Sequence, residues 1–397
     1  MRIVHLRSSF DVGLGYDTLS WPLEQLKLGH DVRVITTDRA SASAAAADTV
    51  SPEDSARLNL PSFEVYGLKV YRLRSSKFKY DDVVLPQGGR ELLERLKPDV
   101  VQVTGSKELM PLFAAKNKSR LGYKLFMKED QYDFPASTPL RRFLIWFEYI
   151  LFRRFLCQWM YNRCDAVMET SMRGVGFIKK YHRIDPKIEI RYTPVCVDLS
   201  RFYPDAKKRK ILRSKMRLKD HDKVILSTGK IVPLKKFELL IESLSKVPKS
   251  ANVQAWLIGG CDKKYLQSLS SLAERLGCLD RVKFMDNVPH EEIPAYQNAA
   301  DIGFWNRSTS SIQEAMSCAL PTITSHYVAT VLPEYEACEL FETNNADSLA
   351  QSITRLASDT NHSKMIAKRC LAMAKKRFDA SKQAKELIAY YKKFMDK

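Results

Sequence analysis

Two lysines beside a glycine are the residues of this sequence whose spacing most directly suggests chemistry. The segment Gly229-Lys-Ile-Val-Pro-Leu-Lys235 follows an apolar run and precedes a helical pattern. Backbone N–H groups in such a loop, together with two ammonium groups, would stabilise a diphosphate as negative charge develops on it. The segment is not a phosphate-binding loop of the G-x-x-x-x-G-K-[ST] type. A solvated charged turn is the alternative interpretation.

A carboxylate further along the chain has the chemistry to bind a sugar ring. We expect a helix from Ser310 to Cys318, with Glu314 in its first turn. A carboxylate can accept hydrogen bonds from both hydroxyls of a ribose. The alternative is that Glu314 only compensates the dipole at the start of the helix.

These residues lie in a chain whose patterns alternate between strand and helix. Its 397 residues suffice for two domains, each with its own core. Short apolar runs such as Ile3–Leu6, Val32–Thr36 and Val253–Ile258 predict parallel strands, with helical patterns between them. The sequence therefore predicts an α/β protein of two doubly wound, Rossmann-like domains facing across a ligand cleft at the carboxyl ends of their strands.

Seven segments of the second half form an ordered series that matches a known pattern. In chain order they read as a glycine-lysine loop, a strand with a glycine pair, D-R-V-x-F, V-P-x-E-E-I, Y-x-x-A-x-D, E-A-M-x-x-x-x-P and D-x-x-A. They are Val224–Lys235, Trp256–Gly260, Asp280–Phe284, Val288–Ile293, Tyr296–Asp301, Glu314–Pro321 and Asp347–Ala350. The linker Pro194–Pro204 also resembles the family's interdomain segment, without its Asn and Gly.

This series resembles the retaining nucleotide-sugar glycosyltransferases of family 4, which have the GT-B fold. The resemblance implies an N-terminal acceptor-side domain over residues 1–203 and a C-terminal nucleotide-sugar domain over residues 204–380. It also implies that a helix over residues 381–397 returns to the N-terminal domain.

The resemblance further implies which residues bind the donor. Lys230 and Lys235 would contact the diphosphate and Glu314 the ribose, while Gly13 and Gly15 would let the ligand approach the backbone closely. The expected donor-binding residues are Gly13, Gly15, Gly229, Lys230, Lys235, Ser310, Ser311 and Glu314.

Three departures from the family pattern concern catalysis. Asn306 stands where the family has the first Glu of its E-x7-E pair, and an amide cannot place a charge beside an oxocarbenium-like centre. Lys230 replaces an arginine of the phosphate loop, so the bidentate fork is missing. The family's frequent His of the N-terminal half is absent, and Glu129 or Asp130 is expected to act as the base or positioning group there; a surface turn is the alternative.

The implied reaction transfers a sugar from a nucleoside diphosphate sugar, of the UDP or GDP type, to an acceptor hydroxyl with retention. Leaving-group stabilisation and positioning would supply much of the rate. Neither a bound metal nor another cofactor is expected, because lysines neutralise the phosphates.

The charge distribution suggests where the acceptor binds. The net charge is +18, and residues 107–200 carry 17 basic residues against 10 acidic ones, while residues 361–397 carry 11 against 3. Such an excess favours an anionic partner. One predicted helix, Arg141–Arg163, has more apolar surface than one core face requires, and its Arg141, Arg142, Trp146, Arg153 and Arg154 fit an anionic membrane surface.

In that helix we expect Phe143, Trp146, Ile150, Cys157 and Tyr161 to form one stripe. Burial of the helix on several sides is the alternative. We expect a cytoplasmic enzyme that binds peripherally to the membrane and acts on a lipid-linked or otherwise anionic glycan. The scattered cysteines and the lack of a signal-peptide pattern agree with this expectation.

Three other classes fit parts of the sequence. A nucleic-acid binder would use the same positive charge, but no nucleic-acid module is recognised, so none is expected as a partner. A catalytically silent GT-B scaffold would explain Asn306, and a sugar-nucleotide epimerase shares the architecture. The sequence leaves the oligomeric state open.

Overall fold

The computed structural model describes residues 1–12, 17–39, 56–75, 85–106, 108–131, 134 and 138–396. The chain divides into two compact units, and one of them is built from two separate stretches. Unit 1 consists of Met1–Val195 with Ala380–Lys397, and unit 2 of Cys196–Asp379. The first boundary thus lies eight residues before the predicted 203/204 boundary. Residues 196–203 belong to unit 2, where the ring of Phe202 lies against His290 at 5.4 Å.

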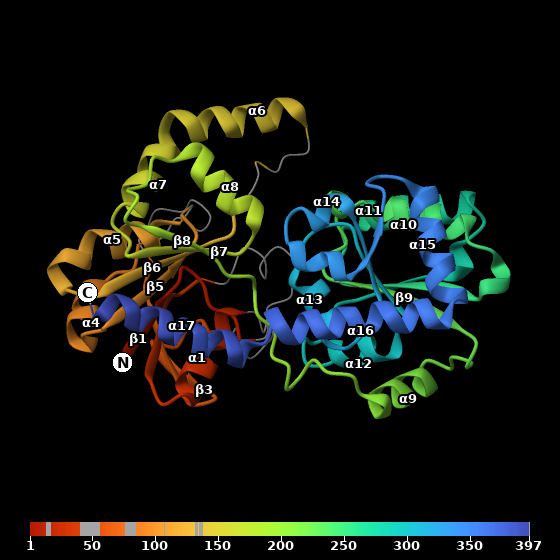
Figure 1. The fold of residues 1–397 in the computed structure, drawn as a ribbon, viewed down its shortest axis with the longest axis horizontal. Coiled ribbons are helices and arrows are strands. Elements are labelled where there is room, and N and C mark those ends of the chain that lie inside the picture. The colour runs from red at the N-terminus through yellow and green to blue at the C-terminus, as the bar shows by residue number, and fades with distance from the viewer. Residues whose placement is uncertain are drawn as a thin grey trace. The chain divides into compact units, whose positions relative to one another are not determined.

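Unit 1 is built around an eight-stranded sheet with the order β3-β4-β2-β1-β5-β6-β7-β8 (Figure 1). All neighbours pair in parallel except β3 with β4. The central strands are buried along almost their whole length, which requires apolar runs such as Val100–Thr104 rather than alternating ones. The strands are β1 (Arg2–Leu6), β2 (Asp31–Thr37), β3 (Ser62–Val65), β4 (Leu68–Leu73), β5 (Val100–Thr104), β6 (Lys124–Glu129), β7 (Ala166–Glu169) and β8 (Glu189–Tyr192).

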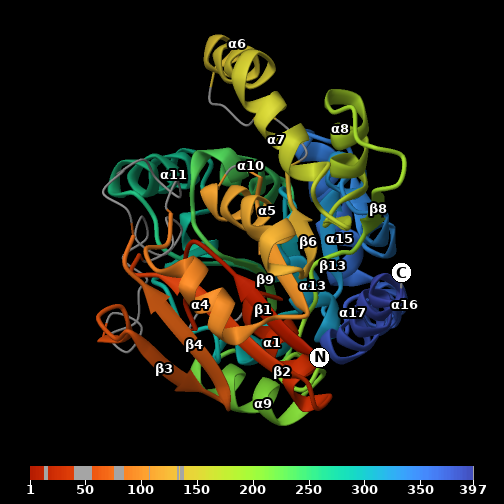
Figure 2. The same ribbon diagram turned by 90° about the vertical axis from the view of Figure 1, so that its left-hand side faces the viewer.

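The helices of unit 1 include one from the far end of the chain. They are α1 (Asp17–Lys27), α4 (Gly89–Leu96), α5 (Leu109–Leu121), α6 (Pro139–Glu148), the π-helical turn η1 (Tyr149–Arg153), α7 (Arg154–Tyr161), α8 (Met172–Tyr181) and α17 (Ala380–Met395). Helix α17 packs on α1, where Trp21 Nε1 donates to Gln383 Oε1 at 3.1 Å. Its Tyr391 hydroxyl donates to Gln102 on β5 at 2.6 Å. The predicted return of the last helix to the N-terminal domain is therefore confirmed (Figure 2).

Unit 2 has a six-stranded parallel sheet with the order β11-β10-β9-β12-β13-β14. Its strands are β9 (Lys223–Thr228), β10 (Val253–Ile258), β11 (Val282–Met285), β12 (Ile302–Trp305), β13 (Thr322–Ser325) and β14 (Glu339–Phe341). Its α-helices are α9 (Ala206–Lys215), α10 (Phe237–Lys246), α11 (Lys263–Arg275), α12 (Ile293–Ala299), α13 (Ser310–Ser317), α14 (His326–Ala329), α15 (Ala346–Ser358) and α16 (Thr360–Arg377). The 3₁₀ turns are η2 (Pro233–Lys235), η3 (Lys249–Ala251), η4 (Leu279–Arg281) and η5 (Pro333–Ala337).

The predicted long helix of unit 1 is interrupted. Helices α6 and α7 are joined by the π-helical turn η1, and the helical stretch ends at Tyr161 rather than Arg163. The predicted stripe is correspondingly wrong in its first half, because Phe143 is 54% exposed and Trp146 36%. Helix α6 is exposed on nearly every side, with Ile145 alone partly buried, whereas Tyr149 at the start of η1 lies in the core.

Candidate functional site

The chain reverses its winding at the centre of the unit 2 sheet. From β9 it proceeds outward through β10 and β11, and from β12 it proceeds outward on the other side through β13 and β14. Ligands of open α/β sheets bind at such a point, outside the carboxyl ends of the strands. Lys230 follows β9 here and Asn306 follows β12, so both predicted residues lie at this position.

Two glycines shape the loop after β9. Gly229 has φ +103° and donates its N–H to the Ile258 carbonyl at 2.9 Å. Gly259 has φ +151°, and a Cβ there would overlap with the carbonyl oxygen of Gly229. Ile231 then donates to the Gly260 carbonyl at 2.9 Å. The loops after β9 and β10 therefore touch through their backbones, which only glycine permits.

Lys235 belongs to the same site because its side chain folds back over the loop. Its Nζ lies 2.9 Å from the position that a Cβ on Gly229 would take. Burial, and secondarily the charge of Lys230, lowers the pKa of Lys235 to about 8. The adjacent Lys236 is different, since its ammonium group donates to Asn344 Oδ1 at 2.7 Å.

Lys230 and Lys235 thus bring two cationic side chains to one loop. Within the described ranges, neither ammonium group has a carboxylate partner. Desolvating a cation beside a like charge is unfavourable unless an anion binds. The loop is accordingly suited to a ligand with several negative charges, such as a diphosphate.

Glu314 is held by a residue that the sequence-based prediction missed. His290 Nε2 lies 2.7 Å from Glu314 Oε1, and both side chains are largely buried. The Phe202 ring packs on the imidazole, and the Arg201 guanidinium lies 3.4 Å from His290 Nδ1. A donor at Nδ1 favours the tautomer that carries its proton on Nε2, so that His290 donates to the carboxylate. The motif gave no signal for this contact, because His290 occupies the variable position of V-P-x-E-E-I.

The expected place of Glu314 in its helix is corrected. Helix α13 begins at Ser310, so Glu314 is its fifth residue and lies beyond the first turn. Dipole compensation acts within the first turn, so this alternative does not explain Glu314. Ser310 and Ser311 do form the first turn and are partly exposed. Asn306 is 8% exposed, in the loop between β12 and α13.

The predicted acidic pair of unit 1 has one buried and one exposed member. Glu129 is 1% exposed, and its Oε1 accepts a hydrogen bond from the Ser106 N–H. It ends β6 opposite Glu169 on β7, whose Oε1 accepts from the Ser171 N–H at 3.0 Å. Burial, then the charge of Glu129, raises the pKa of Glu169 well above its ordinary value. Asp130 is the member of the pair that is exposed.

The remaining predicted residues are distributed as follows. Gly13 and Gly15 lie outside the described residues. Arg141, Arg142 and Trp146 are exposed on α6, whereas Arg153 and Arg154 are partly buried beside the π-helical turn. Arg153 makes an ion pair with Glu148 at 3.8 Å, and the Arg154 guanidinium lies 4.8 Å from the centre of the Phe155 ring.

Comparisons with known proteins agree with this architecture. Residues 208–372 match the model of the glycosyl transferases group 1 family, and residues 13–171 match the glycosyl transferase 4-like domain. A GDP-mannose-dependent alpha-(1-6)-phosphatidylinositol monomannoside mannosyltransferase of Mycolicibacterium smegmatis is 30% identical over 149 residues, 34% of this chain and 38% of the relative. The aligned part spans only about a third of the length of the curated relatives.

Solved structures share the fold over nearly the whole chain. Sucrose-phosphate synthase of Thermosynechococcus elongatus has a TM-score of 0.76 at 16% identity, with 100% of both chains covered. The Anabaena protein HepE, solved in complex with UDP and glucose, has a TM-score of 0.71 at 17% identity, with 98% of this chain and 100% of HepE covered. The two family models together cover most of the chain, and the solved structures agree in fold. The chain belongs to the family-4-like group of glycosyltransferases with the GT-B fold.

Proposed function

We propose that this protein transfers a sugar from a nucleoside diphosphate sugar to an acceptor hydroxyl, with retention and without a bound metal ion. The observation that carries the proposal is the pair Lys230 and Lys235 on the glycine loop at the point where the winding of the unit 2 sheet reverses. Their two positive charges take the part that a metal ion plays in other sites, by stabilising the departing diphosphate. Glu314, oriented by His290, then binds the ribose hydroxyls.

Asn306 and Asp130 are assigned supporting parts in this proposal. Asn306 offers an amide at the carboxyl end of β12, where it can hydrogen-bond a sugar hydroxyl without adding charge. Asp130 is the exposed carboxylate at the end of β6 and serves the acceptor as base or positioning group.

The acceptor in this proposal is a lipid-linked or otherwise anionic glycan at a cytoplasmic membrane surface. Helix α6 supports this choice, since Leu140, Phe143, Leu144 and Phe147 are between 48% and 69% exposed beside Arg141 and Arg142. Exposed apolar residues flanked by arginines are typical of helices at a lipid interface. The mannosyltransferase similar to this chain acts, by its name, on a phosphatidylinositol mannoside. Across the described parts of the chain, every helix is too short or too polar to cross a membrane.

Thermal denaturation in the presence of nucleotides tests the donor site. A ligand that binds only the folded state raises the melting temperature, so UDP, GDP, ADP and their sugar conjugates are compared. We expect one nucleotide series to stabilise the protein and Glu314→Ala to lose that stabilisation while remaining folded. The control variant is Lys236→Ala. Lys236 lies next to Lys235 in the loop after β9, but its ammonium group is bonded to Asn344. Equal stabilisation of wild type and Glu314→Ala would contradict the site.

Product analysis separates this function from its alternatives. Transfer with retention shows as an unchanged anomeric configuration in the product. The transfer activity should persist in the presence of EDTA, since no metal ion is needed. An epimerised nucleotide sugar would indicate an epimerase, and nucleotide binding without hydrolysis or transfer would indicate a silent scaffold. Flotation with vesicles, with and without anionic lipid at physiological salt, tests the membrane surface; no dependence on lipid would refute that part.

A further inference from the structure

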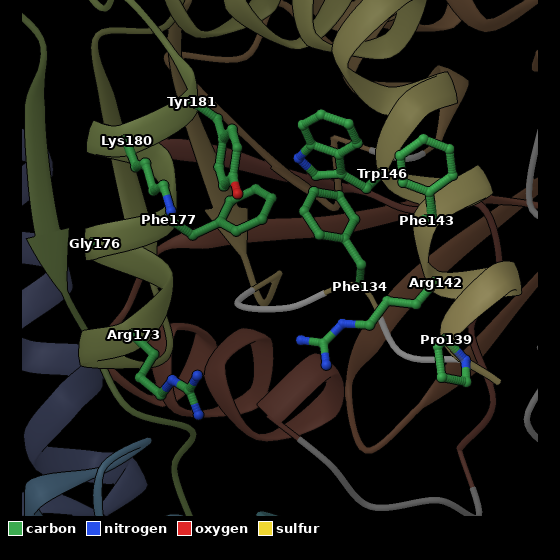
Figure 3. A pocket seen from close by; sticks show the side chains of 10 residues that line it. All are labelled: Phe134, Pro139, Arg142, Phe143, Trp146, Arg173, Gly176, Phe177, Lys180 and Tyr181. Carbon is green, nitrogen blue, oxygen red and sulfur yellow. The ribbon is translucent and has the colours of Figure 1, made fainter. Parts of the chain in front are cut away.

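A pocket of about 580 Å³ opens between helices α6 and α8 of unit 1 (Figure 3). Four of its lining residues come from α6, five from α8, and Phe134 lies between the two helices. They are Pro139, Arg142, Phe143 and Trp146; Arg173, Gly176, Phe177, Lys180 and Tyr181; and Phe134. This volume lies in the range of pockets that hold one small ligand.

One wall of the pocket is well packed and the other is exposed. Phe134 is 6% exposed, and its ring packs on Phe177 at 5.2 Å and on Tyr181 at 5.7 Å. On the α6 side, Phe143 is 54% exposed and Trp146 36%, and their ring centres lie 5.8 Å apart. The pocket thus offers a fixed aromatic floor and an α6 wall whose apolar surface is in contact with solvent.

The charged residues that line the pocket in the described part of the chain all have the same sign. They are Arg142, Arg173 and Lys180, and none of the ten described lining residues is acidic. The two guanidinium groups extend into the space between the helices (Figure 3). Arginine forks match the geometry of phosphate oxygens, and a lysine adds a further point charge. The polar part of a ligand that complements these walls is therefore a phosphate group.

The apolar part of the ligand is indicated by the surface beside the pocket. Leu140, Leu144 and Phe147 lie on the same helix as Phe143 and are 69%, 55% and 48% exposed. A free sugar phosphate would leave this surface in water, whereas an acyl or isoprenoid chain would cover it. Both features, three cations and a continuous apolar helix face, are met by one kind of molecule.

We propose that the pocket between α6 and α8 binds the phosphate-bearing head group of a single membrane amphiphile, with its chain along α6. This inference rests on the proposed function, in which that amphiphile is the acceptor or carries it. It adds Arg173 and Lys180 of α8, which were not among the predicted membrane residues, as the groups that recognise the phosphate.

Binding of monomeric amphiphiles to the full chain tests the proposal. Dodecyl phosphate, used below its micelle concentration, is compared by calorimetry with inorganic phosphate and with dodecyl maltoside. We expect one dodecyl phosphate per chain and an affinity at least about tenfold above that of either other probe. Arg173→Gln/Lys180→Gln should weaken dodecyl phosphate binding by about tenfold or more, because two charge-assisted contacts are lost.

The matched control is Lys179→Gln/Arg183→Gln, which removes the same charge from exposed positions outside the pocket. It should bind dodecyl phosphate as the wild type does. A change in tryptophan fluorescence on binding that disappears in Trp146→Phe would place the ligand in the pocket.

Three outcomes would overturn the proposal. They are equal affinity for inorganic phosphate, equal loss of binding in the control variant, and displacement of dodecyl phosphate by a short oligonucleotide, which would indicate a nucleic-acid site. Nucleotide-induced stabilisation, measured on the same preparations, keeps the two proposals separate. It should be unchanged in Arg173→Gln/Lys180→Gln, and its absence from the wild type would refute the donor site without affecting the amphiphile result.

Discussion

Donor binding is expected to depend on pH through Lys235. In the unliganded protein, burial and the neighbouring Lys230 lower the pKa of this ammonium group to about 8. A bound diphosphate replaces the lost hydration and neutralises the repulsion, so the pKa should return at least to its ordinary value of 10.5. Between these two pKa values the complex holds a proton that the unliganded protein has lost. Nucleotide affinity must therefore fall as the pH rises above 8.

The size of the effect follows from the two pKa values. At pH 7 about nine tenths of Lys235 is protonated without ligand, and at pH 9 about one tenth, so the dissociation constant rises about tenfold, or about 1.4 kcal/mol. At pH 9 binding should also take up nearly one proton for each nucleotide.

Calorimetry with UDP and GDP at pH 7, 8 and 9 and constant ionic strength measures both quantities. Two buffers with different ionisation enthalpies report the proton uptake. Lys235→Gln should bind nucleotide more weakly than the wild type at pH 7, and its affinity should not fall between pH 7 and pH 9. Because the nucleotide ionises in the same way in both experiments, this comparison removes the ligand's own pH dependence. Lys236→Gln should keep the slope of the wild type, because Lys236 is bonded to Asn344. A wild-type affinity that is constant from pH 7 to pH 9, or a slope retained in Lys235→Gln, would refute the reasoning.

Three further expectations concern other parts of the molecule. Gly259→Ala should lower the free energy of unfolding by about 1–3 kcal/mol and weaken nucleotide binding, since the new Cβ overlaps with a backbone carbonyl. Urea unfolding measures the loss of stability. Gly277→Ala is the control for backbone strain alone, because Gly277 has a positive φ but open space around it. Glu169→Gln should be more stable than wild type at pH 8 and equal to it near pH 4. The folded carboxyl keeps its proton above the ordinary pKa of 4.5, so the wild type loses stability as the pH rises. Urea midpoints of both proteins at pH 4 and pH 8 measure this effect. A difference in midpoint between variant and wild type that is the same at both pH values would contradict it. His290→Phe should weaken nucleotide binding with little change in melting temperature, whereas His290→Gln, which keeps a donor for Glu314, should lose less.

The sheet of unit 2 was well predicted because its strands are buried on both faces. Runs such as Val253–Ile258 are apolar except for Gln254, and the segments between them have helical spacing, so the sequence pattern and the fold agree. The loop after β9 could be placed for the same reason, since it follows directly from a strand end.

Unit 1 was harder to predict because contacts distant in sequence decide its details. The π-helical turn η1 has no distinctive residue pattern, and no local pattern indicates that α6 before it, with Phe143 and Trp146, is exposed on nearly every side. The predictions for Glu129 and Asp130 treated adjacent carboxylates as equals. Successive residues at the end of a strand point to opposite faces, and Glu129 faces Ser106 inside the unit. His290 was missed because only the folded structure brings it to Glu314.

The discontinuity of unit 1 has a consequence for synthesis on the ribosome. Unit 2 is one uninterrupted stretch, Cys196–Asp379, so all its residues are translated before the last helix of unit 1. Until α17 appears, the surface around Phe126 that packs against Tyr391 and Phe394 stays uncovered. Chains usually complete their domains from the N-terminus onward. In this protein every residue of unit 2 is synthesised before unit 1 is complete, and a chain ending at residue 379 would contain all of unit 2 but leave an apolar sheet face of unit 1 open to chaperones.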